Sequence, residues 1–403
     1  MVRLLVRKIS SHVYLLRLED NNVKYFEAMW YIPEGITYNA YLVTLEEGAV
    51  LIDTWKHRHA SELVEELSKL IDLRDLKYVV IQHMEQDHSG ALPEVLKANE
   101  FRAVVLGHPM ISKMIESYYH IAPKFRAVGD GEAVNLCGSE FKFYYTSWVH
   151  WPDNIVTYVP SDKILFSSDA FGSYSIPSSI TGEEGVPQEY MNYARKYFAT
   201  VVGHYRDNTL KALSKLNNLI SEVEVLAPAH GMVWKVNREQ IINQYIKWSR
   251  AEGVKGKVVV IYDSMYGFVE EAITMIGREL TKRGADVVYY GFTDVGHPHL
   301  SDVISDALDA SAIIVGVSTY EGSAFPAMEF VIDLIIRKVQ AKKPVAVVGS
   351  YGWGGVAAKR VADKLSKAGF NIVNVLEFRG SPSGEIIEKV RELALQLART
   401  IGT

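Results

Sequence analysis

The sequence of 403 residues contains one cysteine, Cys137. A single cysteine cannot form an internal disulfide, a cysteine-rich zinc site, an iron–sulfur cluster or a fused rubredoxin module. Any metal ion in this protein must therefore be bound by histidine, aspartate and glutamate side chains.

Long apolar runs and clusters of positive charge are also missing. No run approaches the roughly 18 apolar residues of a membrane span, and the opening MVRLLVR lacks the apolar centre and cleavage site of a signal peptide. The formal net charge is −5, and no long block of lysine and arginine is present to bind the phosphates of a nucleic acid. We therefore expect a cytoplasmic protein that binds neither membranes nor nucleic acids.

The sequence also lacks internal repeats, low-complexity segments and the GxGxxG and GKS/GKT motifs that bind dinucleotides and nucleoside triphosphates. NAD and ATP are therefore not expected as resident ligands. With 48% apolar and 23% charged residues, the chain has the composition of a folded globular protein, and its length predicts two or three domains.

The pattern of strands and helices changes near Glu252 and divides the chain into two α/β domains, at 1–252 and 253–403. In the second domain, strands alternate with helical segments, which is typical of an open, doubly wound parallel sheet. Strands of the first domain are predicted at 37–43, 49–52, 78–82, 103–106, 141–145, 155–158 and 164–166. Strands of the second domain are predicted at 258–262, 286–290, 312–317, 345–349 and 371–375.

The strongest functional signal is the segment QHMEQDHSG at 82–90, which follows a predicted strand. Side chains alternate along an extended backbone, so His83, Glu85 and Asp87 project to one side. His88 is carried by the turn that opens the next helix. Four metal-binding side chains are therefore expected to converge.

Three further candidate ligands, His150, Asp169 and His230, lie in loops that follow later strands. Four imidazoles and three carboxylates are more ligands than one ion uses, but they suit two ions if Asp169 bridges them. Three carboxylates also nearly neutralise two divalent cations, which favours a site with two ions. Nitrogen and carboxylate ligands without thiolate suit iron or manganese and do not exclude zinc.

This set of seven side chains resembles the metal pattern of the flavodiiron proteins, also called A-type flavoproteins, whose N-terminal domain has a metallo-β-lactamase-like αββα fold. Hydrolytic members of that fold carry histidine at the position of Glu85 and bind zinc, so Glu85 is the discriminating residue. The resemblance implies two ligand sets joined by a bridge: His83, Glu85 and His150 for one iron, Asp87, His88 and His230 for the other, and Asp169 between them.

Two residues near this set have more than one interpretation. Asp53 either accepts a hydrogen bond from a ligating histidine or caps a turn. By the resemblance, Tyr197 lies near the substrate pocket, and the alternative is that it only packs in the core. The remaining histidines have no comparable context and are expected to be surface or core residues: His12, His57, His59, His108, His120, His204, His297 and His299.

A second group of residues predicts a flavin site. The first strand of the second domain runs into a loop and a helix, whose backbone amides can bind a phosphate with help from Ser264. Two glycine-rich loops leave later strands on the side where doubly wound sheets bind ligands, and Trp353 or Tyr320 is expected to stack on the flavin ring. The predicted contacts are Ser264, Met265, Tyr266, Gly267, Phe268, Val269, Ser318, Thr319, Tyr320, Glu321, Gly322, Ser350, Tyr351, Gly352, Trp353 and Gly354.

The first of these loops departs from the family pattern. In flavodoxins and flavodiiron proteins it usually ends in Gly-Asn-Thr or a similar polar sequence, whereas this chain has Phe268 and Val269. Two polar side chains that commonly bond the phosphate are therefore lost. We expect binding of the flavin to depend more on backbone donors.

The resemblance covers essentially the whole chain and implies an oxidoreductase that reduces dioxygen to water or nitric oxide to nitrous oxide. Its cofactors would be FMN and two iron ions per chain, and its electron donor a rubredoxin, a reduced deazaflavin or a flavin reductase. A head-to-tail homodimer, or a dimer of such dimers, is expected to bring the flavin of one chain to the irons of the other.

Two alternatives remain. One is a binuclear zinc hydrolase with an appended flavodoxin-like module, against which Glu85 speaks. The other is a non-enzymatic FMN electron carrier with a degenerate metal domain, against which the seven intact candidate ligands speak.

Overall fold

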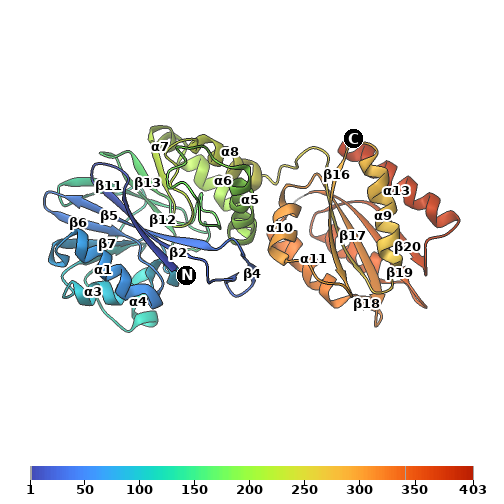
Figure 1. Cartoon of the computed structure of the whole chain (residues 1–403), viewed down its shortest axis with the longest axis horizontal. Helices are drawn as coiled ribbons and strands as arrows, with labels where there is room; N and C mark the ends of the chain where they lie inside the picture. The colour runs from blue at the N-terminus through green and yellow to red at the C-terminus, as the bar shows by residue number, and fades with distance from the viewer. Residues whose placement is uncertain (1, 341, 403) are drawn as a thin grey trace. The chain divides into compact units, whose positions relative to one another are not determined.

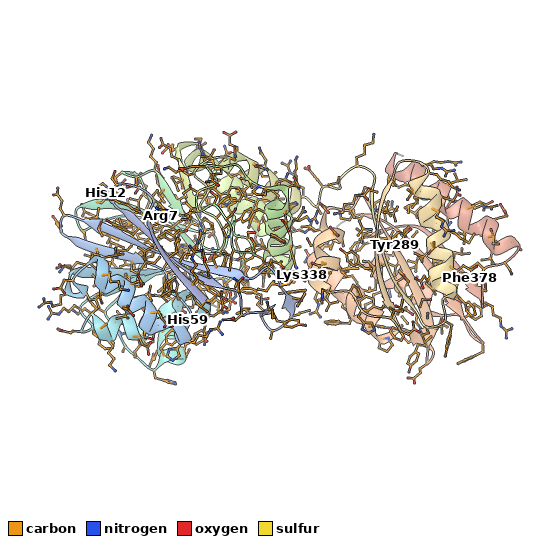
Figure 2. All side chains as sticks on the ribbon, in the orientation of Figure 1. Arg7, His12, His59, Tyr289, Lys338 and Phe378 are labelled. Carbon is orange, nitrogen blue, oxygen red and sulfur yellow. The ribbon has the colours of Figure 1, made fainter. Side chains whose placement is uncertain are left out.

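The computed structural model describes residues 2–340 and 342–402. The chain divides into two compact units, one of residues 2–198 and 205–246 and the other of residues 199–204 and 247–402. No helix in the described ranges is both long and apolar enough to cross a membrane. Side chains fill the space between the layers of each unit (Figure 2).

The first unit contains two sheets with helices outside them. Helices α1, α3 and α4 lie against the first sheet, and α5 to α8 lie on the side of the second (Figure 1). The first sheet has the order β1 (Val2–Lys8), β2 (Val13–Asp20), β5 (Ile36–Leu45), β6 (Gly48–Ile52), β7 (Leu76–Ile81), β8 (Val104–Gly107) and β9 (Phe125–Ala127). The second has the order β10 (Ala133–Leu136), β11 (Ser139–Tyr145), β12 (Ile155–Val159), β13 (Ile164–Phe166) and β14 (Val225–Ala227).

The remaining elements of this unit are short. The hairpin of β3 (Tyr25–Phe26) and β4 (Trp30–Tyr31) is separate from both sheets. The α-helices are α1 (Ala60–Leu70), α2 (Gln86–Ser89), α3 (Leu92–Ala98), α4 (Ile111–Tyr119), α5 (Gln188–Tyr197), α6 (Arg206–Lys215), α7 (Asn217–Glu222) and α8 (Arg238–Ser249). Other helical turns of this unit are η1 (His57–His59) and η2 (Leu73–Asp75), whereas η3 (Phe198–Val202) and η4 (Gly203–Tyr205) lie mostly in the segment 199–204 that belongs to the second unit.

The two sheets pack face to face through alternate side chains. In β13, Ile164 and Phe166 point into the core between the sheets, whereas Leu165 points to the opposite face, toward the helices. The strands β11, β13 and β14 run in one direction, because β12 is antiparallel to both β11 and β13, and β14 is parallel to β13. Their C-terminal ends therefore meet at one edge of the sandwich.

The second unit is a doubly wound parallel sheet, which confirms the predicted fold. The strand order is β16 (Asp286–Thr293), β15 (Lys257–Ser264), β17 (Ala312–Tyr320), β19 (Pro344–Tyr351) and β20 (Asn371–Arg379). This order is that of flavodoxin-like sheets. One face is covered by α9 (Phe268–Thr281) and α13 (Glu385–Ile401), and the other by α10 (Leu300–Asp309), α11 (Pro326–Lys338) and α12 (Ala357–Lys367) (Figure 1).

The strands of this sheet are longer than predicted. β15 continues to Ser264, β17 to Tyr320 and β19 to Tyr351, so several residues predicted to lie in loops form strand ends. The short strand β18 (Ser323–Ala324) turns back antiparallel to the end of β17. Parallel pairing along the sheet extends each strand beyond its apolar run.

Candidate metal centre and flavin cleft

Four loops of the first unit carry the seven predicted metal ligands. The segment after β7 supplies four of them, and the loops after β11, β13 and β14 supply His150, Asp169 and His230. Six of the seven side chains are buried, and Glu85 is half-buried. The strand directions described above explain why residues so far apart in the sequence meet.

The seven side chains form two groups, and Asp169 faces both. Its Oδ2 lies 3.1 Å from Nε2 of His83 and 3.3 Å from Nε2 of His150. Its Oδ1 lies 3.3 Å from Nε2 of both His88 and His230. One carboxylate oxygen directed at each group is the arrangement expected of a bridge. Within each group the ligand atoms lie within 4.8 Å of one another, in the sets His83, Glu85, His150, Asp169 and Asp87, His88, His230.

The hydrogen bonding of these groups fits bound cations. Six buried ligand atoms have no hydrogen-bond partner among the described residues: Nε2 of His83, His88 and His230, both carboxylate oxygens of Asp87, and Oδ2 of Asp169. Buried polar atoms without partners are rare in folded proteins, and a metal ion is one of the explanations for them. The set of nitrogen and carboxylate ligands suits iron.

Charges within the metal-free cluster compensate one another. Burial alone would raise the pKa of Asp169, but the nearby His88 and His83 imidazoles hold it well below its usual range. Burial alone would lower the pKa of His150, but the carboxylates of Asp169 and Glu85 raise it to about 10. In the metal-free cluster, protons on the imidazoles therefore supply the positive charge that divalent cations supply when metal binds.

The outer nitrogens of three candidate ligands are held by neighbouring groups. His230 Nδ1 lies 2.7 Å from the carbonyl oxygen of Thr37, and His83 Nδ1 lies 3.3 Å from Oγ of Ser168. His88 Nδ1 lies 3.6 Å from Oδ2 of Asp53. Such partners fix the orientation and tautomer of a ligating histidine.

Asp53 lies beside a proposed ligand, as the first of its two interpretations expects, and its hydrogen bonds join two distant segments of the chain rather than capping a turn. Its carboxylate faces His88 and also accepts hydrogen bonds from the backbone amide and the side-chain amide of Gln82, at 2.8 and 3.0 Å. It thereby fixes the start of the ligand-bearing segment after β7. Asp53 has a positive φ of 56°, which aspartate tolerates better than most residues.

Tyr197 contacts the proposed bridge directly. Its hydroxyl donates a hydrogen bond of 2.7 Å to Oδ1 of Asp169, and the side chain is fully buried. Burial raises the pKa of Tyr197 well above its usual value, and the Asp169 charge adds to the effect. The phenol therefore stays protonated and acts as a donor toward the metal centre.

Sequence reasoning missed a buried guanidinium that supports the His230 loop. Arg17 is fully buried, donates to the carbonyl oxygen of Gly231 at 2.7 Å and donates to Oδ1 of Asn39 at 3.0 Å. Asn39 in turn donates to the carbonyl oxygens of Pro228 and Gly231. The sequence gives no local signal for this contact, because Arg17 and Gly231 are far apart along the chain.

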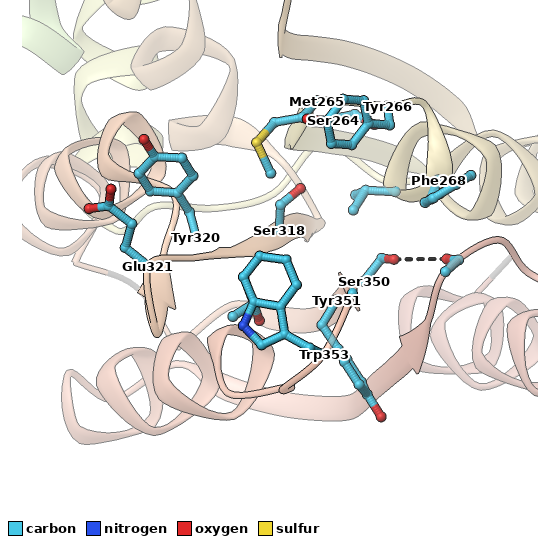
Figure 3. Close-up of a pocket in the computed structure, with 14 residues that line it drawn as sticks. Ser264, Met265, Tyr266, Phe268, Ser318, Tyr320, Glu321, Ser350, Tyr351 and Trp353 are labelled. Carbon is cyan, nitrogen blue, oxygen red and sulfur yellow. Dashed lines mark hydrogen bonds between the residues drawn. The ribbon is translucent and has the colours of Figure 1, made fainter.

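The flavin cleft of the second unit has a volume of about 310 Å³ and lies at the C-terminal ends of β15, β17 and β19 (Figure 3). This volume lies within the usual range for small-molecule sites. Thirteen of the sixteen predicted contacts line the cleft, and Gly267, Gly322 and Gly354 do not. Gly380, which follows β20, lines it as well and was not predicted.

Aromatic side chains border the cleft. Trp353 and Tyr320 reach it from the loop after β19 and the end of β17, and Tyr266 extends from the loop after β15 (Figure 3). Trp353 is 95% exposed and Tyr266 82% exposed, so neither ring is held by packing within the chain. Exposed rings beside a cleft are available to stack on a planar ligand.

The start of α9 fits a phosphate group. Gly267 precedes the helix with a φ of 86° and carries no side chain to cap it, while Oγ of Ser264 accepts a hydrogen bond of 3.4 Å from the Glu270 amide of the first turn. The amides of that turn have no partner within the helix and form an anion site. Val269 points into the core and Phe268 is apolar, so a phosphate at this turn would depend mainly on backbone donors, and its binding here stays a prediction.

Comparison with known proteins extends over the whole chain. Residues 36–231 match the family model described as ODP family beta lactamase, and residues 260–393 match the flavodoxin model. A solved flavo di-iron protein from Thermotoga maritima is 37% identical, with a TM-score of 0.94, covering 100% of this chain and 99% of that chain. Rubredoxin:oxygen oxidoreductase from Desulfovibrio gigas is 28% identical, with a TM-score of 0.92 and 99% coverage of both chains.

A curated relative shows the same extent of similarity. The nitric oxide reductase of Moorella thermoacetica is 28% identical, and the similarity covers 98% of this chain and 98% of that protein. The similarities span both units in one order, and the flavodoxin match covers the unit that contains the cleft. The chain therefore belongs to the flavodiiron proteins, oxidoreductases whose cofactors are FMN and a two-iron centre.

Proposed function

We propose that this protein reduces dioxygen to water or nitric oxide to nitrous oxide, using electrons that FMN passes to two irons in the first unit. The observation that carries the proposal is the position of Asp169, with one oxygen facing each ligand group, in a site that also contains Glu85. A solved relative named for oxygen chemistry and a curated relative named for nitric oxide chemistry support it.

The ligands are proposed to divide between the two ions as the two groups divide. His83, Glu85 and His150 would hold one iron, and Asp169 would bridge to the other, which is held by Asp87, His88 and His230. When bound, the irons supply the electrons and open coordination positions that reduction of a diatomic gas requires.

The side chains around the metal centre exclude bulk water, and one of them supplies a hydrogen-bond donor. The rings of Phe26 and Tyr38 lie 6.1 and 5.5 Å from the His230 ring, and Tyr174 lies 5.2 Å from Tyr197, all measured between centroids. These aromatic walls exclude bulk water from the second ligand group. The Tyr197 hydroxyl keeps a proton directed at Oδ1 of Asp169, which stabilises the negative charge of the bridge.

The flavin is proposed to bind in the cleft of the second unit, within the flavodoxin-like domain that we assign to residues 253–403. The start of α9 would hold the phosphate, and Trp353 or Tyr320 would stack on the ring. The electron donor is proposed to be a rubredoxin, a reduced deazaflavin or a flavin reductase.

We further propose that the flavin of one chain serves the irons of a second chain in a head-to-tail homodimer. Support comes from the separation of the two sites into different compact units. The test mixes two inactive variants, Asp169→Ala without the iron bridge and Gly267→Trp with a blocked phosphate site, and measures turnover. Recovery of activity on mixing supports transfer between subunits, and its absence despite exchange of subunits contradicts it.

The function itself is tested with purified protein loaded anaerobically with iron and FMN. Two irons and one FMN per chain are expected, with consumption of dioxygen or nitric oxide when an artificial reductant is supplied. The ratio of kcat/KM for the two gases then identifies the preferred substrate. Two zinc ions per chain from iron-replete cells, together with hydrolase activity, would support the zinc hydrolase instead.

A further inference from the structure

A small cavity lies in the first unit between the second sheet and the helices on its outer side. Its floor is formed by Val156 of β12 and Leu165 of β13. Its roof is formed by Ala212 and Leu213 of α6, together with Leu216 just beyond that helix. Helices α6, α7 and α8 lie on this side of the unit (Figure 1).

One end of the cavity meets the loops that carry two proposed metal ligands. Val149, which precedes His150, and Ala170, which follows Asp169, both line the cavity. Tyr245 also lines it, and the Asp169 charge raises the pKa of its phenol, in addition to the larger effect of burial. A molecule in the cavity therefore lies behind the backbone of the metal centre.

Three of the hydroxyl groups on the wall are bonded to protein atoms. The Thr146 hydroxyl accepts a hydrogen bond from Asn154, at 2.7 Å. The Ser167 hydroxyl donates to the carbonyl oxygen of Ala170 at 2.8 Å, and the Thr209 hydroxyl donates to that of Tyr205 at 3.1 Å. The phenol oxygen of Tyr245 faces backbone donors of Phe171 and Gly172. A water molecule in the cavity would gain few hydrogen bonds, so the cavity is expected to be dry.

The cavity has room for a diatomic molecule and an opening toward solvent. The cavity has a volume of about 20 Å³, which exceeds the roughly 10–15 Å³ that one water molecule requires. Ala212 and Leu213 on α6 and Ile220 on α7 are only half-buried. The cavity is thus open on its helical side and too small for an organic substrate.

We propose that this cavity binds a small uncharged diatomic gas and forms part of the substrate's route from solvent to the metal centre. The identity of that gas as dioxygen or nitric oxide rests on the proposed function. An apolar gas gains free energy when it leaves water for an apolar cavity, whereas water does not. Its lining includes both half-buried helix residues and neighbours of two proposed ligands, which places it between solvent and the ligand loops.

The first test is xenon, an apolar atom that binds dry cavities. Crystals of the full chain, loaded with iron and FMN, are pressurised with xenon, and one peak is expected between α6 and the strands β12 and β13. Ala212→Leu fills the same space with a larger aliphatic side chain and should remove the peak. Ordered water in the cavity of the original protein, or no xenon under pressure, would overturn the proposal.

The second test is kinetic. Ala212→Leu should raise the KM for the gas severalfold while kcat at saturating gas, iron content and FMN content stay unchanged. Ser214→Leu is the matched control, because it places the same side chain on the exposed face of α6. If Ala212→Leu does not fold, Ala212→Val provides a smaller filling change with the same expected direction.

Two results separate this proposal from the proposed function. If Ala212→Leu expels xenon but leaves the KM unchanged, the cavity is not on the route of the substrate. If the loaded protein reduces neither gas, the proposed function fails, whatever the xenon peak shows.

Discussion

At the scale of single residues, Glu85 determines the charge of the first ligand group. Glu85→His would replace an anionic oxygen with a neutral nitrogen, and two carboxylates would remain to balance two cations. Ferric iron gains most from anionic oxygen ligands, whereas zinc accepts imidazole readily. We expect less iron, more zinc and a loss of gas reduction of more than about 100-fold, since outer contacts alone are worth 10–100-fold.

The measurement is iron, zinc and FMN content with anaerobic turnover of both gases. FMN content should equal that of the original protein, because the cleft lies in the other unit. Retained iron with unchanged turnover would show that Glu85 does not set the choice of metal.

Tyr197 is a second residue whose contribution can be isolated. Tyr197→Phe removes the hydroxyl that donates to Asp169 but keeps the ring. We expect iron affinity or turnover to fall by about 10–100-fold, as for other groups that hold metal ligands. Tyr193→Phe is the control, because its hydroxyl bonds to Glu189 on the same helix, away from the metal ligands. Equal iron retention and equal turnover in the two variants would mean that Tyr197 contributes packing alone.

The metal ligands were predictable from sequence, whereas the groups that hold them were not. The HxExDH segment places four metal-binding side chains within six residues, which is a local signal. Thr37 supports His230 through a backbone carbonyl, and every residue has one. Arg17 is an isolated charged residue until the fold brings it to Gly231. Supports of this kind depend on tertiary contacts and have no sequence pattern.

At the scale of elements, the parallel strands of the second unit were easy to predict because they are continuous apolar runs. The strands β1 and β2 were not predicted, since buried Arg17 and Glu19 interrupt the apolar pattern of β2. Gly380 was not predicted either. It lies after β20, whereas the predicted flavin loops follow only β15, β17 and β19.

The end of β15 gives a prediction about pH. Burial raises the pKa of Asp263 to about 6, although hydrogen bonds from Ser318 oppose the shift. The folded state therefore holds a proton between about pH 4 and 6 that the unfolded state has lost, and stability falls as the pH rises through this window. The decrease amounts to about 3 kcal/mol.

Asp263→Asn should remove this decrease, because the amide cannot ionise and still accepts a hydrogen bond from Ser318. The measurement is the temperature at which FMN is released from the full chain between pH 4 and 7. If the FMN-release temperature of the variant falls with pH as steeply as that of the original protein, the pH dependence belongs to another group.

At the scale of the whole molecule, metal binding and protonation are linked. In the metal-free protein, the raised pKa of His150 means that its charged form stabilises the fold. That contribution is complete below the ordinary histidine value of about 6.5 and is lost as the pH rises through about 10. Metal-free protein should thus lose thermal stability between pH 7 and 10, whereas iron-loaded protein should lose less.

Calorimetry of chelated and iron-loaded protein across this range checks the prediction. Addition of ferrous iron to the metal-free protein should also release protons, because the imidazoles must be neutral to bind the metal. Parallel stability curves for the two forms, with no proton release, would contradict the proposed ligand set.

The most direct test of the account is the rate at which reduced flavin is reoxidised by substrate. Fully reduced protein, with ferrous iron and reduced FMN, is mixed with dioxygen or nitric oxide, and flavin absorbance is followed by stopped flow. We predict rapid reoxidation in the iron-loaded protein and only the slow rate of flavin alone in the zinc-substituted protein and in Asp169→Ala, both with full FMN content. Equally fast reoxidation in all three proteins would show that the metal centre does not reduce the gas.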